Sequence, residues 1–327
     1  RHPCDSVRII ALLRSQPAPG MNELKKDENQ FKNKIVVDGE TYTPTIKAYK
    51  NFDFLMSGGA RPIRILCEYY EPLTRLETLG IEATILFFAS ARAHSPEKHA
   101  KVVAQTEKDL AAAKEGTPEH TKVKADLLRL QRLKWMCQFH KPIRELAKKL
   151  SEWGVKRAAQ DLKKVSVCSG GGPGLMEAAN KGASEVKGSG SVGMGISVPY
   201  QKGLNPGVTN DLGFLFHYFF TRKYWMANIC HGLVAFPGGF GTMDELFEIM
   251  TLVQTGKHPD IPFVLFGKKF WNTVVNWDCL VEMGTVSPRD VERLYITDDV
   301  EDAFKYITSY IDKSETANKP ATSAPKN

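Results

Sequence analysis

The sequence predicts an α/β protein with a doubly wound, Rossmann-like parallel sheet and helices on both faces. Short apolar segments typical of buried parallel strands recur along the chain, at 81–89, 165–168, 192–198, 232–236 and 261–267. Segments with helical spacing of apolar residues separate them. Two of the strands run directly into glycine-rich turns that open a helix. In such sheets ligands bind beyond the carboxyl ends of the strands, so we expect the site there.

The composition indicates a soluble globular protein, with 42% hydrophobic and 25% charged residues and no apolar run of the ~18 residues that a membrane helix needs. Six cysteines lie apart without a C-x-x-C pair, which argues against a disulfide framework and against a structural zinc site. We therefore expect reduced thiols, no metal and a cytoplasmic location. Because the first residue is Arg1 and not Met, import into an organelle is left open.

The net charge of +7 is concentrated in one segment. Residues 97–164 hold 17 Lys and Arg against nine Asp and Glu. These charges follow amphipathic helices and are not interleaved with stacking aromatic residues, which favours a solvated helical face over a nucleic-acid surface. We expect neither a nucleic acid nor a membrane as a partner.

The chain is expected to form one domain with two additions. These are an N-terminal extension with little core over residues 1–51, a single domain over 52–312, and a disordered tail over 313–327. Within the domain, basic helices near 97–114 and 120–152 are interpreted in part as an insertion. The pattern also predicts an aromatic helix over 214–230 and a final helix over 297–312.

The turn Pro237-Gly238-Gly239-Phe240-Gly241-Thr242 joins a strand to a helix. Its glycines let a ligand approach the main chain, and the N–H groups of the first helical turn point at the same spot, which suits a phosphate. A purely structural reading stays open, because Thr242 to Glu245 also fits the T-x-x-E capping box. The same order of strand, glycine turn and helix occurs at Ser169–Gly174.

A second glycine pattern is rejected. Residues 188–193 match G-x-G-x-x-G but precede a strand, whereas a dinucleotide-binding turn follows one, and there is no G-x-x-x-x-G-K-[ST] sequence. Arg222 is more informative, because its neighbours three and four positions away are apolar or aromatic. A guanidinium buried there needs an anionic partner, which is either a structural carboxylate or a ligand.

Three motifs together resemble the LONELY GUY (LOG) family of cytokinin riboside 5′-monophosphate phosphoribohydrolases, in its second, longer type; these proteins are often mislabelled lysine decarboxylases. The segment Pro237–Glu245 is similar to the family's P-G-G-x-G-T-x-x-E, and Gly170–Asn180 to its G-G-G-P-G-x-M-E-A-A-N. Phe219–Lys223 resembles the R-K element between them. Ala89 stands where the family commonly has a glycine, and the segment 97–152 is longer and more basic than expected.

The resemblance implies hydrolysis of the N-glycosidic bond of a nucleoside 5′-monophosphate, giving a free base and ribose 5-phosphate. It implies that Arg222 and Glu245 are catalytic, with the carboxylate stabilising positive charge on the ribose or activating water. It implies substrate or phosphate binding by Ser90, Gly171, Gly172, Met176, Glu177, Lys223, Gly238, Gly239, Gly241 and Thr242.

The substrate implied is AMP or a cytokinin riboside monophosphate, with no metal or organic cofactor and no lysine in a context that suggests a pyridoxal Schiff base. Two alternatives stay open: a broad purine and pyrimidine 5′-nucleotide nucleosidase, and a non-catalytic nucleotide-binding or carrier protein on the same fold. The resemblance also implies a homodimer or larger assembly. Candidate contacts are the aromatic helix and the region 61–79.

Overall fold

The computed structural model describes residues 35–42, 45–199 and 203–317, so the predictions for residues 1–34 and 318–327 lie outside the described residues. The chain divides after Arg61 into two units. In the first unit β1 (Ile35–Val37) and β2 (Glu40–Tyr42) form an antiparallel hairpin, followed by η1 (Ala48–Lys50), α2 (Phe52–Met56) and η2 (Gly58–Ala60). Among its described side chains only Ala60 is buried.

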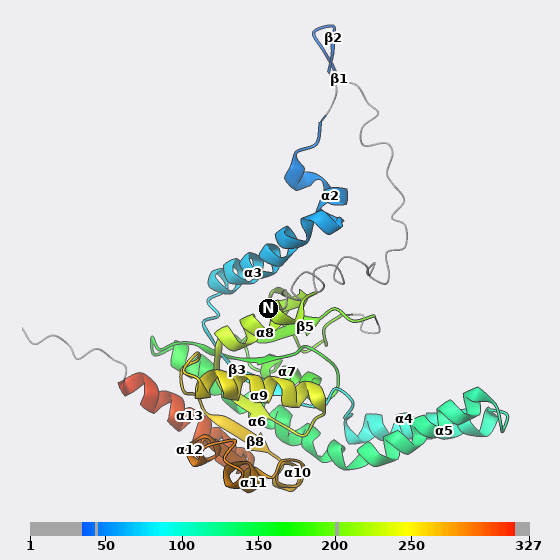
Figure 1. The fold of residues 1–327 in the computed structure, drawn as a ribbon, viewed down its shortest axis with the longest axis vertical. Coiled ribbons are helices and arrows are strands. Elements are labelled where there is room, and N and C mark those ends of the chain that lie inside the picture. The colour runs from blue at the N-terminus through cyan, green and yellow to red at the C-terminus, as the bar shows by residue number, and fades with distance from the viewer. Residues whose placement is uncertain (1–34, 43–44, 200–202, 318–327) are drawn as a thin grey trace, which may run out of the picture. The chain divides into compact units, whose positions relative to one another are not determined.

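The second unit contains a seven-stranded sheet in which every neighbouring pair is parallel, with the order β6-β5-β4-β3-β7-β8-β9 (Figure 1). The strands are β3 (Ala83–Phe88), β4 (Val165–Ser169), β5 (Ser191–Ile196), β6 (Gly213–Phe216), β7 (Cys230–Ala235), β8 (Phe263–Phe266) and β9 (Leu294–Thr297). The predicted fold class is confirmed, and the five predicted strands are present with ends within two residues of those expected.

The strand order reverses at β3, which has β4 on one side and β7 on the other. After β3 the chain builds outward through β4, β5 and β6, then returns to add β7, β8 and β9 on the opposite side. The loops that follow β3, β4 and β7 therefore meet at one edge of the sheet. A parallel sheet presents its ligand site at such a point.

Helices cover both faces of this sheet (Figure 1). The helical segments from residue 61 onward are α3 (Arg61–Thr78), α4 (Pro96–Ala112), α5 (Pro118–Leu133), η3 (Lys134–Phe139), α6 (His140–Ala158), α7 (Leu175–Ser184), η4 (Asn210–Leu212), α8 (Phe219–Asn228), α9 (Phe240–Gln254), α10 (Lys268–Val274), α11 (Trp277–Glu282), α12 (Pro288–Glu292) and α13 (Val300–Ala317). None of the helices described is long and apolar enough to cross a bilayer.

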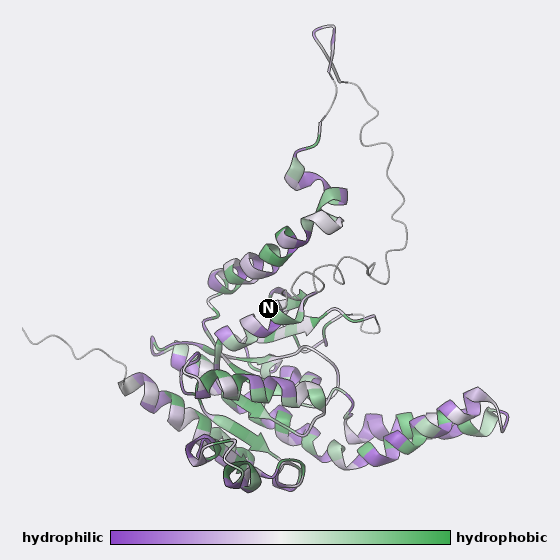
Figure 2. Cartoon of the chain, viewed as in Figure 1, coloured by the Kyte–Doolittle hydropathy of each residue, from purple (hydrophilic) through white to green (hydrophobic). Residues whose placement is uncertain are grey.

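Alternate residues of the central strand supply two separate cores, since successive side chains of a strand point to opposite faces. Ile85 and Phe87 belong to the core that α6, α7 and α13 cover, whereas Leu86 and Phe88 belong to the core that α8, α9 and α10 cover. Figure 2 shows the strands as the hydrophobic centre of this unit, with mixed colouring on the helices around them.

The basic segment 97–152 has two structural roles. Helices α4 and α5 pack against each other, and each begins with Pro after a hydroxyl N-cap, Ser95 or Thr117. Helix α6 instead buries Ile143 and Leu146 against the sheet and packs along α7. The segment predicted as a basic insertion thus includes α6, which packs on the sheet, whereas α4 and α5 pack on each other.

The aromatic helix predicted over 214–230 is wrong at both ends. Residues 213–216 form the edge strand β6, the helix α8 covers only Phe219–Asn228, and Cys230 already belongs to β7. Phe214 and Phe216 are buried while Leu215 is 58% exposed, the alternation of a strand. The dense aromatic content concealed this short period-two pattern beside the helical one.

The C-terminal prediction also needs correction. Residues 294–297 form strand β9, which pairs with β8, and the helix begins only at Val300 and continues to Ala317. Residues 313–317 of the predicted disordered tail are thus helical. The segment after β8 forms two helices, α10 and α11; Val275 is the C-cap of the first, and Asn276 caps the second by accepting a hydrogen bond from Cys279 N at 3.1 Å.

Candidate active site

The loops after β3, β4 and β7 are joined by backbone hydrogen bonds through Ser90. Its N–H donates to the carbonyl of Pro237 at 3.2 Å, and its carbonyl accepts from Leu175 N at 3.1 Å. Ser90 therefore lies between the two glycine turns and ties one to the other. The two turns therefore lie together at the reversal of the strand order.

The first turn, residues 170–174, requires glycine for two reasons. Two of its residues have positive φ angles, and a Cβ atom on its glycines would come too close to neighbouring atoms. Gly171 and Gly174 have φ of +65° and +74°. A Cβ on Gly170 would lie 2.9 Å from Nη2 of Arg222, and one on Gly174 would lie 2.7 Å from the carbonyl oxygen of Ser90. These glycines are required both for the turn and for the approach of the arginine.

Two buried asparagines that the sequence analysis missed hold this turn in place. Asn180 accepts from Ser169 Oγ at 2.6 Å and donates to Ser191 Oγ and to the carbonyl of Val192. Asn205 donates to the carbonyl of Gly172 and to Asn180 Oδ1, both at 2.9 Å. Asn180 stood inside the second motif, but nothing in the sequence identified its partners. The loop after β5 thus supports the turn after β4.

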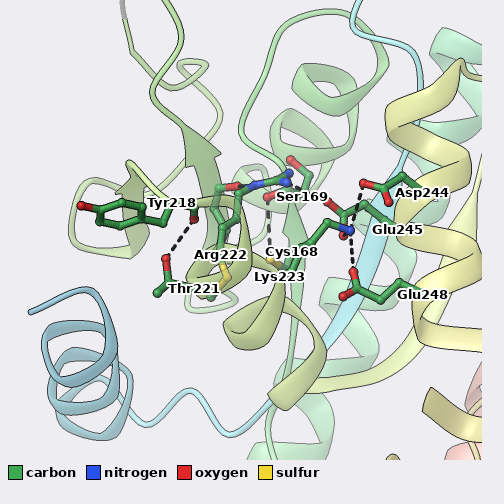
Figure 3. Close-up of polar contacts among 10 residues, drawn as sticks. Cys168, Ser169, Tyr218, Thr221, Arg222, Lys223, Asp244, Glu245 and Glu248 are labelled. Carbon is green, nitrogen blue, oxygen red and sulfur yellow. Dashed lines mark hydrogen bonds and ion pairs between the residues drawn. The ribbon is translucent and has the colours of Figure 1, made fainter. Parts of the chain in front are cut away.

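The anionic partner that Arg222 requires is Glu245. Arg222 Nη1 donates to Glu245 Oε1 at 2.7 Å, and its Nε donates to the carbonyl of Met194 at 2.8 Å. The two residues are 8% and 3% exposed. Figure 3 shows the side chains reaching toward each other from α8 and α9. The sequence required a partner for Arg222, and the fold supplies it from a helix 23 residues away.

The capping-box interpretation of Glu245 is wrong. Helix α9 has Gly239 as its N-cap and begins at Phe240, so Thr242 lies inside the helix and Glu245 is its sixth residue. Burial raises the pKa of Glu245 above its ordinary value, while Arg222 and Lys223 lower it and Glu248 and Asp244 raise it further. The carboxyl is thus less acidic than an exposed glutamate, a property typical of groups that exchange protons in catalysis.

Lys223 lies among three carboxylates. Its Nζ is 2.6 Å from Glu248 Oε2, 2.9 Å from Asp244 Oδ2 and 3.4 Å from Glu245 Oε2 (Figure 3). Burial lowers the pKa of Lys223, but the hydrogen bonds to Glu248 and Asp244 outweigh it and hold the pKa above its ordinary value. The lysine is therefore a fixed cation next to the buried pair.

The second turn, residues 237–242, leaves an open backbone surface. A Cβ on Gly238 would lie 2.0 Å from Thr242 Oγ1, so this glycine lets the threonine pack over it. Gly239 and Gly241 are exposed and have nothing within 4 Å of a Cβ position. The N-cap of α9, Gly239, has no side chain, and its carbonyl accepts from the N–H groups of Thr242 and Met243. The N–H groups of Phe240 and Gly241 lie at the exposed start of this 15-residue helix, a position that suits an anion.

Met176 and Glu177 were both predicted to bind substrate, but their side chains have different surroundings. The sulfur of Met176 lies 3.1 Å from a Cβ position on Gly170, next to Arg222. Glu177 accepts from Lys181 Nζ at 2.5 Å and lines a separate cavity of about 540 Å³ with His94, His140 and other residues. Neither Arg222 nor Glu245 lines that cavity. The described partner of the Glu177 carboxylate is thus Lys181 on the same helix.

Glu68 on α3 is a further residue that the sequence did not reveal. Its carboxylate accepts from His217 N at 2.7 Å and from Thr221 Oγ1 at 2.5 Å, and its carbonyl accepts from Trp225 Nε1. It thereby receives the donors at the start of α8, the helix that carries Arg222. Among residues 35–42, 45–199 and 203–317, no group of three or more His, Cys, Asp or Glu is arranged to hold a metal ion.

Comparison with known proteins shows that part of this chain has relatives. Residues 176–307 match a family model described as possible lysine decarboxylase. The chain is similar to cytokinin riboside 5′-monophosphate phosphoribohydrolases. Identity to LOG1 of Arabidopsis thaliana is 30% over 95 residues, which is 29% of this chain and 45% of the relative. Identity to a protein of Mycobacterium tuberculosis is 35% over 91 residues, 26% of this chain and 46% of that one.

A third relative has a broader name. The pyrimidine/purine nucleotide 5′-monophosphate nucleosidase of Escherichia coli is 32% identical over 117 residues, which is 33% of this chain and 25% of that protein. The chain therefore spans less than half the length of each of these three relatives. The matched region contains Arg222, Lys223 and the whole second turn. Over residues 176–307 this chain is therefore similar to the family whose model matches, and parts of the chain are similar to phosphoribohydrolases of the LOG type.

Proposed function

We propose that this chain hydrolyses the N-glycosidic bond of nucleoside 5′-monophosphates, releasing a free base and ribose 5-phosphate. The observation that carries the proposal is the buried Arg222–Glu245 pair, 2.7 Å between Nη1 and Oε1, next to a glycine turn at the carboxyl edge of the sheet. The relatives named phosphoribohydrolases and nucleosidases support it.

The reaction adds water to C1′ of the ribose and breaks its bond to the base. The bonding pair leaves with the base nitrogen, which gains a proton as the water loses one, so the step balances without an oxidant or reductant. Positive charge develops on the ribose, and a fixed carboxylate such as Glu245 stabilises it or accepts the proton of the water. Arg222 orients that carboxylate, and Lys223 is the second cation beside it.

The phosphate is assigned to the second turn. The start of α9 offers backbone N–H groups and an uncovered surface at Gly239 and Gly241, while Thr242 and Gly238 shape the turn. Ser90 borders this turn through its hydrogen bond to the carbonyl of Pro237, and Gly171 and Gly172 are assigned to the phosphate from the resemblance of the second motif. Met176, beside Gly170 and Arg222, is assigned to the sugar or base, whereas Glu177 lines a cavity without the buried pair and is assigned no contact with the reacting bond.

Either a cytokinin riboside monophosphate or a broader range of nucleotides can be the substrate, since relatives carry both names. A panel of AMP, GMP, CMP and isopentenyladenosine monophosphate separates the two, with free base measured by chromatography. Release from the isopentenyl substrate alone favours the narrow function. Comparable release from all four favours the broad one.

The decisive variant is Glu245→Gln, with Glu292→Gln on α12 as an exposed control. We expect Glu245→Gln to remove base release while its unfolding curve shows a folded protein, and the control to keep wild-type turnover. Near wild-type turnover of Glu245→Gln would refute the catalytic assignment of Glu245. A wild-type protein that binds AMP but releases no adenine would favour a non-catalytic nucleotide-binding protein.

Self-association is also proposed. Large apolar side chains of α3, β6 and α8 are more than half exposed, namely Leu66, Tyr70, Leu215, Phe219 and Phe220. Exposed apolar patches of this kind mark protein contacts. Light scattering after size exclusion should give at least a dimer, and Phe219→Asp with Phe220→Asp should lower its mass toward that of one chain.

A further inference from the structure

Glu245 has two cationic neighbours at unequal distances. Arg222 Nη1 is 2.7 Å from Oε1, whereas Lys223 Nζ is 3.4 Å from Oε2. Coulomb attraction falls with distance, and a hydrogen bond beyond ~3.2 Å is weak. The carboxylate therefore has one close partner and one loose partner, although both cations come from adjacent positions of α8.

The longer distance between Lys223 and Glu245 is explained by two other carboxylates that bind the same ammonium group. The ammonium of Lys223 is 2.6 Å from Glu248 and 2.9 Å from Asp244, both of which are on α9 together with Glu245. Glu248 follows Glu245 by three positions, so the two lie on neighbouring parts of the same helix surface. Lys223 is only 16% exposed, which limits the competition from water for its three donors.

We propose that Glu248, assisted by Asp244, is a positioning residue that holds Lys223 away from Glu245 and leaves that carboxylate with a single close cation. The proposal rests on the function proposed above, in which Glu245 acts as a base or as the stabilising anion. A carboxylate gripped closely by two cations is a weaker base and is less free to respond to charge on the sugar.

The charges that face Glu245 come from two helices. Arg222 and Lys223 on α8 favour its ionised form, while Glu248 and Asp244 on α9 oppose it, and burial opposes it most. The surroundings of Arg222, the turn at Gly170 and the Met194 carbonyl on β5, add the buried thiol of Cys168, whose pKa burial raises and Arg222 lowers. Removing the charge of Glu248 should lower the pKa of Glu245 in two ways. A repelling negative charge disappears, and Lys223 is free to move closer to Glu245.

The test uses two substitutions with opposite expected signs. Glu248→Gln should shift the acidic limb of the profile of kcat/KM against pH to lower pH, by about 0.5–1 unit, because Glu245 becomes more acidic. Lys223→Met should shift the same limb to higher pH by a similar amount, because a cation is lost. Asp244→Asn, at a side chain 56% exposed, should act like Glu248→Gln but more weakly. Glu292→Gln is the control.

A second readout does not depend on activity. The carboxyl carbon of Glu245 is followed by ¹³C NMR during a pH titration, and its resonance is assigned by its loss in Glu245→Gln. Opposite displacements of its midpoint in Glu248→Gln and Lys223→Met support the positioning role. Displacements of the same sign, or none, overturn it.

The two readouts separate this proposal from the proposed function. If the midpoints move as expected but no nucleotide of the panel releases base, the positioning role stands and the proposed reaction falls. If base is released and the limb stays fixed in both variants, the reaction stands and Glu248 has only a structural role.

Discussion

Arg222→Met is the most informative perturbation of this molecule, because it leaves a buried carboxylate without its close partner. Met has similar length and suits the apolar surroundings of Trp225 and Met226. The change removes the bond from Nη1 to Glu245 and the bond from Nε to the carbonyl of Met194. The side chains of the pair are only 9% and 4% exposed, so water compensates little.

The expected cost follows from this burial. Breaking a buried ion pair from one side costs about 3–5 kcal/mol, because the remaining charge is unpaired. Lys223 still lies 3.4 Å from Glu245, and the raised pKa of Glu245 lets it take up a proton, so both reduce the penalty. We expect the free energy of unfolding to fall by about 2–4 kcal/mol at pH 8.

The sign of the pH dependence is fixed by linkage. An acid whose pKa is higher in the folded than in the unfolded state binds more protons when folded, so it stabilises the fold as pH decreases. Loss of Arg222 raises the pKa of Glu245 further above its unfolded value. The deficit of Arg222→Met relative to wild type should therefore be smaller at pH 5 than at pH 8.

Urea unfolding at both pH values measures this, with Glu245→Gln and the double variant completing a cycle. The double variant should recover part of the stability lost in Arg222→Met, because it no longer buries an unpaired carboxylate. A deficit below about 1 kcal/mol at pH 8, or an equal deficit at both pH values, would contradict the reasoning about the buried pair.

Three further predictions concern the backbone and the turns. Gly182→Ala places a Cβ 2.1 Å from the carbonyl oxygen of Arg144, so α7 and α6 must separate, and urea unfolding should show a loss of at least about 2 kcal/mol; an unchanged midpoint would disprove this contact. Gly241→Ala meets nothing within 4 Å, so stability should stay equal or rise by up to about 1 kcal/mol, yet KM for AMP should increase if phosphate lies against this turn. An unchanged KM would remove Gly241 from the phosphate site. Asn180→Ala leaves the buried hydroxyl of Ser169 and the carbonyl of Val192 without this hydrogen-bond partner, so the free energy of unfolding should fall by about 2–3 kcal/mol in the same assay. A loss below about 1 kcal/mol would count against the network.

The sequence by itself determined the α/β class and placed two glycine turns at the carboxyl ends of strands, where the candidate site lies. The apolar runs do not alternate with polar residues, as strands with one face in water do. They therefore indicated strands covered on both faces, which is typical of a parallel sheet. Glycines that begin one residue beyond 165–168 and 232–236 indicated turns at the carboxyl ends. It also determined that Arg222 needs an anion, because its own helix offers apolar neighbours. These conclusions depend on local pattern and on the cost of burying a charge, and both can be evaluated without coordinates.

Only the tertiary structure decided which anion that is. Glu245 fitted a local cap as well as a distant partner, and the choice depended on where α9 begins relative to α8. Likewise, the sequence pattern placed Phe214 and Phe216 in a helix, whereas in the structure they belong to an edge strand that pairs with β5. Lys223 is held by Glu248 and Asp244 through contacts more than 20 residues apart in the sequence. Contacts of this range depend on how the helices pack across the sheet, which residue spacing along one helix does not encode.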